Sequence, residues 1–303
     1  MPSTREKPCA AYTARMNPNP SPLTPVTTAD GLTLQGQAWP VTGPVASRGA
    51  VLIVHGLGEH IGRYAPLAAK LNVWGWDAVG FDQRGHGRSE GPRGGLAHED
   101  DLLRDLAPAI DAARTAFPGP LVLLGHSMGG LVAARFVPES LQAAPAAWVR
   151  PVDALMLSSP ALDPGMNAFQ KLLLAMLGGI APGLAVGNGL KPAWISRDPA
   201  VVAAYVADPL VHDRVTPRLV RFLLDGGALV RNLAPRWAVP TLLLWAGSDR
   251  CVAPAGSAAF AAAAPPARMR AQCFAPMFHE IFNEPDKDTA FAALGAWLAG
   301  LGR

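Results

Sequence analysis

The sequence lacks any apolar stretch long enough to cross a bilayer, which takes about 20 residues. Its longest apolar region covers residues 172–186 and is interrupted by three glycines and one proline. Residues 1–25 also lack the apolar segment that a secretory signal peptide requires. We therefore expect a cytoplasmic protein without a membrane-spanning helix, in which residues 1–25 form a disordered leader.

Cysteine is scarce as well. The chain contains only Cys9, Cys251 and Cys273, and no two of them have CxxC spacing. Such a set is typical of reduced thiols rather than of a disulfide framework, and it offers no pattern of metal ligands. We expect neither a disulfide nor a metal site.

Charge is sparse too, because only 16% of the residues are charged and the formal net charge is +3. No run of Lys and Arg is long enough to follow a nucleic-acid backbone, so we expect no nucleic-acid partner. Half of the residues are hydrophobic, which excludes a disordered chain and allows a large core. The composition leaves the oligomeric state open.

From residue 32 onward, short apolar runs alternate with longer helical patterns. Residues 32–38 alternate between apolar and polar side chains, as in an antiparallel strand with one exposed face. Helical patterns begin near Arg63, near Glu99 and directly after Ser127. This order predicts right-handed βαβ units, and hence a mostly parallel central sheet with helices on both faces. The almost wholly apolar runs typical of strands buried on both faces are Ala50–Val54, Ala78–Phe81, Leu121–Leu124, Ala154–Leu157 and Thr241–Trp245.

The alternation stops between Ala161 and Arg236, where the pattern is helical or irregular and shows no convincing strand. We interpret residues 161–236 as a helical cap inserted into a core that comprises residues 26–160 and 237–303. Such an insertion would lie over the carboxyl ends of the strands, where open α/β sheets bind ligands. The alternative is a peripheral decoration with no role at the site.

The strongest local pattern is GHSMG at residues 125–129, which fits G-x-S-x-G. An apolar run precedes it and a helical pattern follows, so we expect Ser127 at a sharp strand-to-helix turn. Glycines at positions 125 and 129 leave room for that turn, and the helix directs its N-terminal N–H groups toward the site. We predict that Ser127 is a catalytic nucleophile. The alternative is a serine that only caps the helix.

A serine nucleophile needs a base, and the base needs an acid that holds its tautomer. After a turn of this kind the partners follow in the order Asp or Glu, then His. His279 lies in a loop after the last apolar stretch and is the predicted base, whereas His212 falls within the cap. Asp249 lies in a turn after an apolar run and is the predicted acid. Two aspartates fit this role less well: Asp225, in the cap, and Asp153, which precedes a strand.

Acyl transfer also needs donors for the negative oxygen of its transition state. The first predicted donor is the backbone N–H of Met128, directly after the nucleophile. The second should come from the loop after the first long parallel strand, where glycines flank Leu57, so we assign it to the Leu57 N–H. We expect His55, at the start of this loop, to brace the loop rather than to act as a second base.

Six stretches from residue 55 onward carry a family resemblance. They are HGLGEHIGRY (55–64), FDQRGHGRSEGPRG (81–94), GHSMGG (125–130), DPLVHD (208–213), AGSDRCV (246–252) and HEIFNE (279–284). Together they resemble the monoacylglycerol lipase and lysophospholipase branch of the α/β-hydrolase superfamily. The resemblance implies an α/β-hydrolase fold, a cap that forms an apolar acyl channel, and an ester hydrolase that needs no cofactor. It also carries over Ser127, Asp249 and His279 as a catalytic triad, with Leu57 and Met128 as the oxyanion residues.

The predicted cap contains one strongly apolar stretch, which could line an acyl channel or rest on a lipid surface, so that the protein would be peripheral to membranes. Ordinary packing on the core is the alternative. The cap carries eight Lys and Arg, five Asp and no Glu, which weighs against an aminopeptidase because a substrate amine calls for acidic partners. The residues of the stretch are Leu172, Leu173, Leu174, Met176, Leu177 and Ile180.

We therefore predict a serine hydrolase of carboxylic esters, with monoacylglycerols as the first candidate substrate. A lysophospholipase or a short- or medium-chain carboxylesterase would use the same residues. A non-catalytic lipid-binding module is the alternative from another class, and an intact Ser–Asp–His set in the right order disfavours it.

Overall fold

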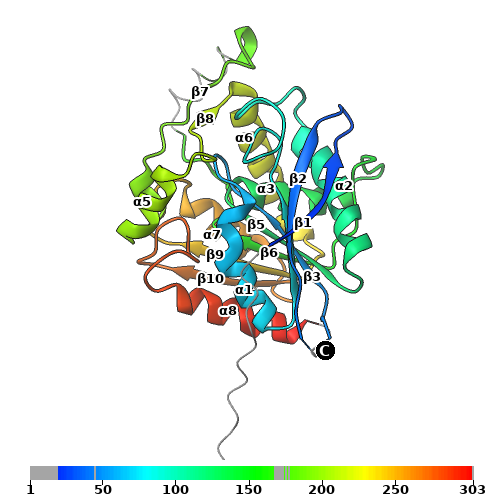
Figure 1. Cartoon of the computed structure of the whole chain (residues 1–303). Coiled ribbons are helices and arrows are strands. Elements are labelled where there is room, and N and C mark those ends of the chain that lie inside the picture. Colours follow the sequence, from blue (N-terminus) through cyan, green and yellow to red (C-terminus); the bar gives the residue numbers. More distant parts are fainter. Residues whose placement is uncertain (1–19, 44–45, 167–173, 175, 177, 302–303) are drawn as a thin grey trace, which may run out of the picture.

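Figure 1 shows the computed structural model, which describes residues 20–43, 46–166, 174, 176 and 178–301. An eight-stranded sheet forms its centre and helices cover both faces, as the alternating pattern predicted. The strands are β1 (Ser21–Thr27), β2 (Thr33–Trp39), β3 (Ala50–Val54), β4 (Asp77–Phe81), β5 (Leu121–His126), β6 (Ala154–Ser158), β9 (Thr241–Ala246) and β10 (Met269–Phe274).

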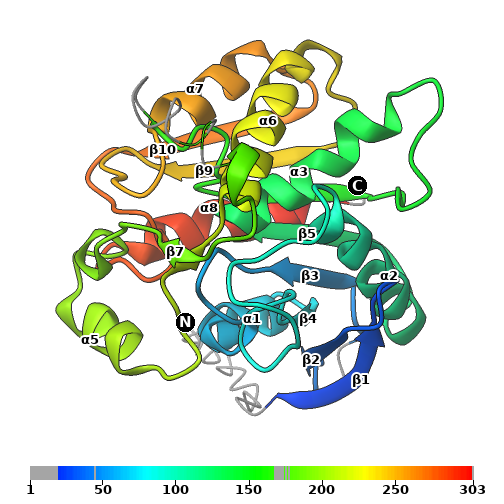
Figure 2. The same ribbon diagram turned by 90° about the horizontal axis from the view of Figure 1, so that it is seen from above.

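The sheet order is β1-β2-β4-β3-β5-β6-β9-β10, and Figure 2 shows it running from β1 at one edge to β10 at the other. Strand β2 is antiparallel to both of its neighbours, and all other neighbouring strands are parallel. In chain order, the five apolar runs predicted as buried strands are β3, β4, β5, β6 and β9. Every residue of β3, β4, β5 and β6 is buried, because helices pack on both faces of these strands.

The N-terminal hairpin corrects the predicted leader. Residues 21–25, which the sequence assigned to it, belong to β1 and pair with β2. Pro22, Pro25 and a register shift between Leu23 and Val26 obscure the alternation by which a strand is recognised. An edge strand tolerates proline because its outer N–H groups need no partner within the sheet. The rest of the leader prediction falls on residues 1–19, outside the described residues.

Two groups of helices cover the sheet. A 3₁₀ turn, η1 (Ile61–Tyr64), leads into α1 (Ala65–Val73), which packs on one face together with α8 (Lys287–Gly300). The opposite face is covered by α2 (Asp101–Ala116), α3 (Met128–Ser140) and α7 (Pro254–Ala263). Within the described part of the chain, none of the helices is both long and apolar enough to cross a bilayer.

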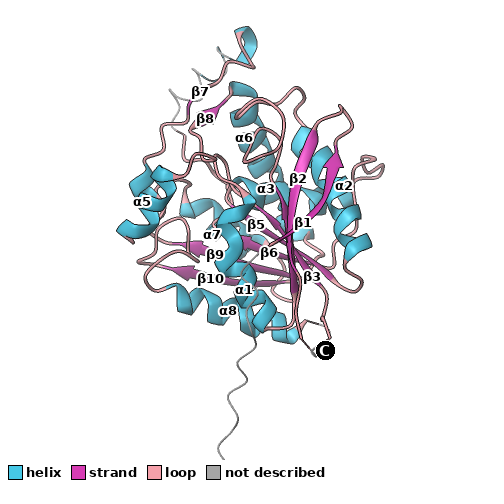
Figure 3. Ribbon diagram, viewed as in Figure 1, coloured by secondary structure: helices cyan, strands magenta, loops and turns pink. Residues whose placement is uncertain are grey.

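The segment between β6 and β9 contains helices, turns and one short strand pair (Figure 3). The pair joins β7 (Val186–Gly187) to β8 (Arg214–Val215), so the expectation of no strand here was wrong. Strands of two residues are too short to show any alternation in the sequence. The other elements of this segment are η2 (Pro192–Trp194), α5 (Pro199–Ala207), α6 (Pro217–Asn232) and η3 (Ala234–Arg236).

Helix α6 ties the end of this segment to the core. The Thr216 side chain caps its first turn by accepting from the Leu219 N–H at 3.3 Å. Leu219, Phe222 and Val230 are buried in the same hydrophobic cluster as α3. The last part of the predicted cap is thus packed as firmly as the sheet helices.

Candidate active site

Ser127 stands between β5 and α3. Its backbone has φ 54° and ψ −120°, a strained conformation for a residue other than glycine. Two hydrogen bonds hold the turn: the Ser127 N–H donates to Ser158 O at 3.0 Å, and the Ala161 N–H donates to Ser127 O at 2.9 Å. The turn is as sharp as the G-x-S-x-G pattern predicted.

The two glycines of this pattern prevent backbone collisions. A Cβ on Gly125 would lie 2.4 Å from the Gly129 carbonyl oxygen, and a Cβ on Gly129 would lie 2.0 Å from the Val54 carbonyl oxygen. The structure places these collisions between β5 and the first turn of α3, and between α3 and the end of β3.

His279 and Asp249 form a hydrogen-bonded pair from two neighbouring strand ends. Asp249 follows β9, His279 lies in the loop after β10, and His279 Nδ1 is 2.7 Å from Asp249 Oδ2. The N–H groups of Cys251 and Val252 donate to Asp249 Oδ1 at 2.8 and 3.1 Å. The side chains of the pair are 7% and 1% exposed, so the structure brings the predicted base and acid together in a buried setting.

The electrostatics of the pair suit proton transfer. Burial by itself would lower the pKa of His279, but the charge and hydrogen bond of Asp249 outweigh it and the pKa is raised. Burial opposes ionisation of Asp249 as well, yet His279 and the two backbone donors lower its pKa. An ionised Asp249 that accepts a hydrogen bond from the Nδ1–H leaves Nε2 of a neutral His279 free to take a proton.

A cavity of about 430 Å³ has both Ser127 and His279 in its wall. Leu57, from the loop that follows β3, lines the same cavity. The opposite wall comes from the segment between β6 and β9, whose residues from Asn188 to Asp213 contribute eleven side chains. The side chains of this segment therefore shape the space in front of Ser127.

Of the two predicted oxyanion donors, Leu57 lines this cavity and Met128 directly follows Ser127, which lines it. Met128 is the first residue of α3, and Leu57 belongs to the loop of residues 55–60, which we call loop 55–60. Among the described residues, no protein acceptor receives either N–H. His55 braces the loop, as expected, because its Nε2 accepts from the Gln83 N–H at 2.9 Å.

Two of the three candidates that the sequence disfavoured lie away from the cavity. Asp225 is exposed on α6, and Asp153 accepts from the Leu121 N–H at the start of β5, at the opposite end of the strands from Ser127. His212 does line the cavity, but its ring packs against His86 with centroids 4.7 Å apart. Its Nδ1 accepts from the Arg214 N–H at 3.1 Å, so this ring belongs to the cavity wall.

Within the described residues, one group of side chains has metal-ligand spacing: Asp249, Cys251 and His279, whose ligand atoms lie within 4.8 Å of one another. His279 Nδ1 is already engaged with Asp249. Burial raises the pKa of the Cys251 thiol well above its usual range, which keeps the thiol protonated and a poor ligand. These contacts are better explained by the hydrogen-bonded pair than by a metal.

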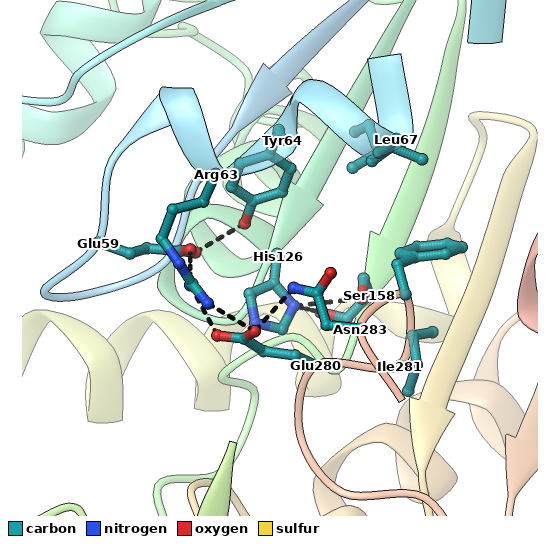
Figure 4. Close-up of a pocket in the computed structure, with 11 residues that line it drawn as sticks. Glu59, Arg63, Tyr64, Leu67, His126, Ser158, Glu280, Ile281 and Asn283 are labelled. Atoms are coloured by element: carbon teal, nitrogen blue, oxygen red, sulfur yellow. Dashed lines mark hydrogen bonds and ion pairs between the residues drawn. The ribbon is translucent and has the colours of Figure 1, made fainter. Parts of the chain in front are cut away.

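An ionic network beside the cavity was not predicted. Figure 4 shows Arg63 between the carboxylates of Glu59 and Glu280, with the Tyr64 hydroxyl pointing at Glu59. Its members fall within the quoted stretches HGLGEHIGRY and HEIFNE, so the sequence carried the signal but no spacing rule connected them. Close by, burial lowers the pKa of His126 to about 4, which keeps this ring neutral next to His279.

A Hydrolase_4 family model described as serine aminopeptidase, S33, matches residues 45–286. The chain belongs to this family. The matched residues include Ser127, Asp249 and His279.

Relatives with named activities align with most of this chain. The monoacylglycerol lipase of Mycolicibacterium smegmatis is 32% identical over 259 residues, or 83% of this chain and 88% of that protein. Phospholipase YtpA of Bacillus subtilis is 32% identical over 264 residues, covering 86% of this chain and 97% of its own length. The crystal structure of Paleococcus ferrophilus monoacylglycerol lipase superposes with a TM-score of 0.75 at 33% identity, covering 88% of this chain and 98% of the other. The fold is that of the α/β-hydrolases.

Proposed function

We propose that this S33 family member hydrolyses monoacylglycerols through an acyl-enzyme on Ser127. His279, held by Asp249, takes the Ser127 proton through Nε2 as the hydroxyl oxygen attacks the ester carbonyl. The backbone N–H groups of Leu57 and Met128 donate to the oxyanion. Glycerol leaves with the proton from His279, and water then repeats the attack to release the fatty acid.

The observation that carries this proposal is the His279–Asp249 hydrogen bond at the cavity that Ser127 also lines. The strained turn presents Ser127, and the first turn of α3 supplies the Met128 N–H directly after it, which no acceptor among the described residues receives. A nucleophile, a base with an orienting acid and two unengaged donors are the parts that acyl transfer requires.

Two observations support a lipid ester as the substrate. Monoacylglycerol lipases are among the relatives that match most of the chain. The cavity also has apolar side chains that suit an acyl chain, since each buried methylene contributes about 0.8 kcal/mol. These side chains are Leu57, Leu190, Pro192, Ile195, Val206 and Val211.

The family name raises peptide hydrolysis as another activity, but the acidic groups at the cavity disfavour it. An aminopeptidase needs a carboxylate free to bind the substrate amine. Glu59 and Glu280 are both paired with Arg63. Asp208 accepts from His60 Nε2 at 2.8 Å, and Asp213 is paired with Arg214. These carboxylates are already engaged within the protein, which favours a neutral ester over a cationic peptide terminus.

A lysophospholipid is the second candidate substrate. Lys191 lies in the cavity wall and could pair with a phosphate head group, and the Bacillus subtilis phospholipase is a relative of similar identity. Apolar side chains on the outside of the same segment further suggest that the protein contacts lipid surfaces. Ile180 is 83% exposed, Leu184 53% and Val186 44%.

The test is Ser127→Ala, which should lower ester turnover by about a thousandfold or more because the acyl-enzyme can no longer form. Ser140→Ala, at the far end of α3, is the matched control and should retain wild-type turnover. Circular dichroism of both variants checks that the fold is intact. Unchanged turnover in folded Ser127→Ala would contradict the proposal.

A substrate panel separates the candidate esters. Monoacylglycerols and lysophosphatidylcholines of matched chain lengths are assayed beside nitrophenyl esters of two to sixteen carbons. We expect the largest kcat/KM for a monoacylglycerol of medium or long chain. A maximum at two to four carbons would instead identify a short-chain esterase, and a maximum with lysophosphatidylcholine that Lys191→Met reduces would identify a lysophospholipase.

A further inference from the structure

The ionic network beside the cavity joins the two loops that carry the proposed machinery. Glu59, in loop 55–60, accepts from the Gly56 N–H at 2.6 Å, one residue before Leu57. Glu280 directly follows His279 in the chain. Arg63 contacts both carboxylates: its Nη1 lies 2.6 Å from Glu59 Oε2 and 2.7 Å from Glu280 Oε1.

The geometry of these contacts is that of a rigid connection. The Arg63 guanidinium binds Glu280 through two parallel hydrogen bonds, of 2.7 and 2.8 Å, so its orientation is fixed as well as its position. The side chains of Arg63, Glu59 and Glu280 are 12%, 5% and 7% exposed. Water can scarcely replace any of these bonds, so a change in one partner should be transmitted to the other loop.

The network also reaches the segment opposite the sheet. The Arg63 guanidinium lies 4.8 Å from the centre of the Tyr205 ring in α5. The Glu280 N–H donates to the Ile195 carbonyl oxygen at 2.8 Å. Arg63 is therefore the point at which loop 55–60, the His279 loop and the segment between β6 and β9 meet.

Arg63 does not itself face the substrate space. Glu59, Tyr205 and Glu280 line the 430 Å³ cavity, and Arg63 lies behind them. We propose that Arg63 is a positioning residue, which holds the Leu57 N–H and His279 in the relative arrangement that ester hydrolysis requires. This role rests on the proposed function.

Arg63 also sets the charge around His279. The Glu59 and Glu280 carboxylates both favour the protonated form of His279, and Arg63 offsets part of their charge. Removal of the guanidinium should therefore raise the pKa of His279 further. The titratable and charged groups that face His279 from the elements around it are Asp249 and Cys251 after β9, Glu280 in its own loop, Glu59 and Arg63 after β3, and His126 at the end of β5.

The experiment compares Arg63→Met with Arg84→Met, using a nitrophenyl ester as substrate over a range of pH. Arg84 is another buried arginine, with a side chain that is 4% exposed, and it binds Asp101 and Asp105 in the core, away from the cavity. We expect Arg63→Met to lower kcat by about 100-fold, the usual cost of misplacing reacting groups by about 1 Å, with little change in KM. The acidic limb of its kcat/KM profile should move to higher pH, because the base must be neutral. Arg84→Met should leave that limb in place.

Two further variants keep the test decisive if Arg63→Met folds poorly. Arg63→Lys keeps the charge but loses the two parallel bonds, so its acidic limb should stay near wild type while kcat falls to an intermediate value. Glu280→Gln removes a carboxylate beside His279 and should move the limb to lower pH. Wild-type kcat in Arg63→Lys together with an unmoved limb in Glu280→Gln would overturn the proposal. Equal effects of Arg63→Met and Arg84→Met would overturn it as well.

Failure of the proposed function gives a different result. If the folded wild-type protein turns over no ester, or if Ser127→Ala retains turnover, the proposed function fails and the role of Arg63 fails with it. If wild-type turnover depends on Ser127 and the Arg63 variants match wild type in kcat and pH profile, only the role of Arg63 is overturned.

Discussion

The segment between β6 and β9 has two parts that differ in how they meet the core. None of the residues in the outer part, 178–187, is buried, and the side chains of Ile180, Leu184 and Val186 face solvent. The anchored part, residues 195–216, is hydrogen-bonded to both loops of the candidate site. Its His212 N–H donates to Gly58 O at 2.9 Å, and its Ser196 hydroxyl donates to Asn283 O at 2.9 Å.

This difference suggests that the two parts of the insertion have different roles. The anchored part completes the walls of the cavity and fixes the loops that hold Leu57 and His279. The outer part contributes little to the core and is free to contact a lipid surface. Substitutions in the anchored part should therefore reduce stability and kcat, whereas substitutions in the outer part should affect only activity on lipid.

The largest effect is expected at Glu284, which is fully buried in the His279 loop and binds the Arg197 N–H at 2.6 Å and the Arg197 Nε. Glu284→Ala leaves both donors unpaired and should lower the free energy of unfolding by about 2–3 kcal/mol. We expect kcat to fall about tenfold as the loop shifts. Chemical denaturation and ester turnover measure the two effects.

The control for this variant is Asp286→Ala, which removes a half-exposed carboxylate bound to the same Arg197. Because exposed ion pairs contribute little, it should change stability by less than about 0.5 kcal/mol. Equal losses of stability in Glu284→Ala and Asp286→Ala would mean that exposed ion pairs, rather than the buried Glu284 carboxylate, anchor the segment.

A smaller effect is expected at Asp208, the partner of His60 in loop 55–60. Its carboxylate also accepts from the Leu210 N–H at 2.9 Å, and its side chain is 25% exposed. Asp208→Ala should cost about 1 kcal/mol of unfolding free energy and a few-fold in kcat. Asp225→Ala, at an exposed aspartate on α6 that does not line the cavity, should have neither effect. Thermal denaturation and kcat at neutral pH distinguish these outcomes.

The smallest effect on the folded protein is expected in the outer part. Ile180→Ser should change stability by less than about 0.5 kcal/mol and leave turnover of a soluble ester unchanged. Binding to phosphatidylcholine vesicles should weaken, because an apolar side chain no longer enters the lipid interface. Val73→Ser, at a similarly exposed valine on α1, controls for general surface hydrophobicity. Vesicle binding that responds equally to both substitutions would contradict a lipid-contacting role for the outer part.

Local patterns predicted the central sheet well and its edge poorly. Strands β3, β5 and β9 lie in near-continuous apolar runs, because burial on both faces excludes polar side chains. Strand β1 escaped recognition, since an edge strand can contain prolines and its side chains are mostly exposed. The short pair β7–β8 is formed by residues far apart in the chain, which no local pattern reveals.

The candidate site was likewise predictable from local patterns only in part. Ser127 could be predicted because a tight turn imposes glycines at fixed positions, and chain order narrowed its partners to Asp249 and His279. The contact of Arg63 with Glu280 joins positions 217 residues apart, so it depends on how η1 and the His279 loop pack rather than on any spacing rule. The apolar stretch of the predicted cap was tested only in part, because Leu172, Leu173 and Leu177 lie outside the described residues.

The most direct test of the central claim is to locate a fluorophosphonate adduct by peptide mass spectrometry. The proposed mechanism predicts a single adduct on Ser127 in the folded wild-type protein, strongly reduced in His279→Ala because the hydroxyl then lacks its base. A folded wild-type protein that remains unlabelled, or an adduct on another residue with Ser127 unmodified, would contradict the assignment of Ser127 as the nucleophile.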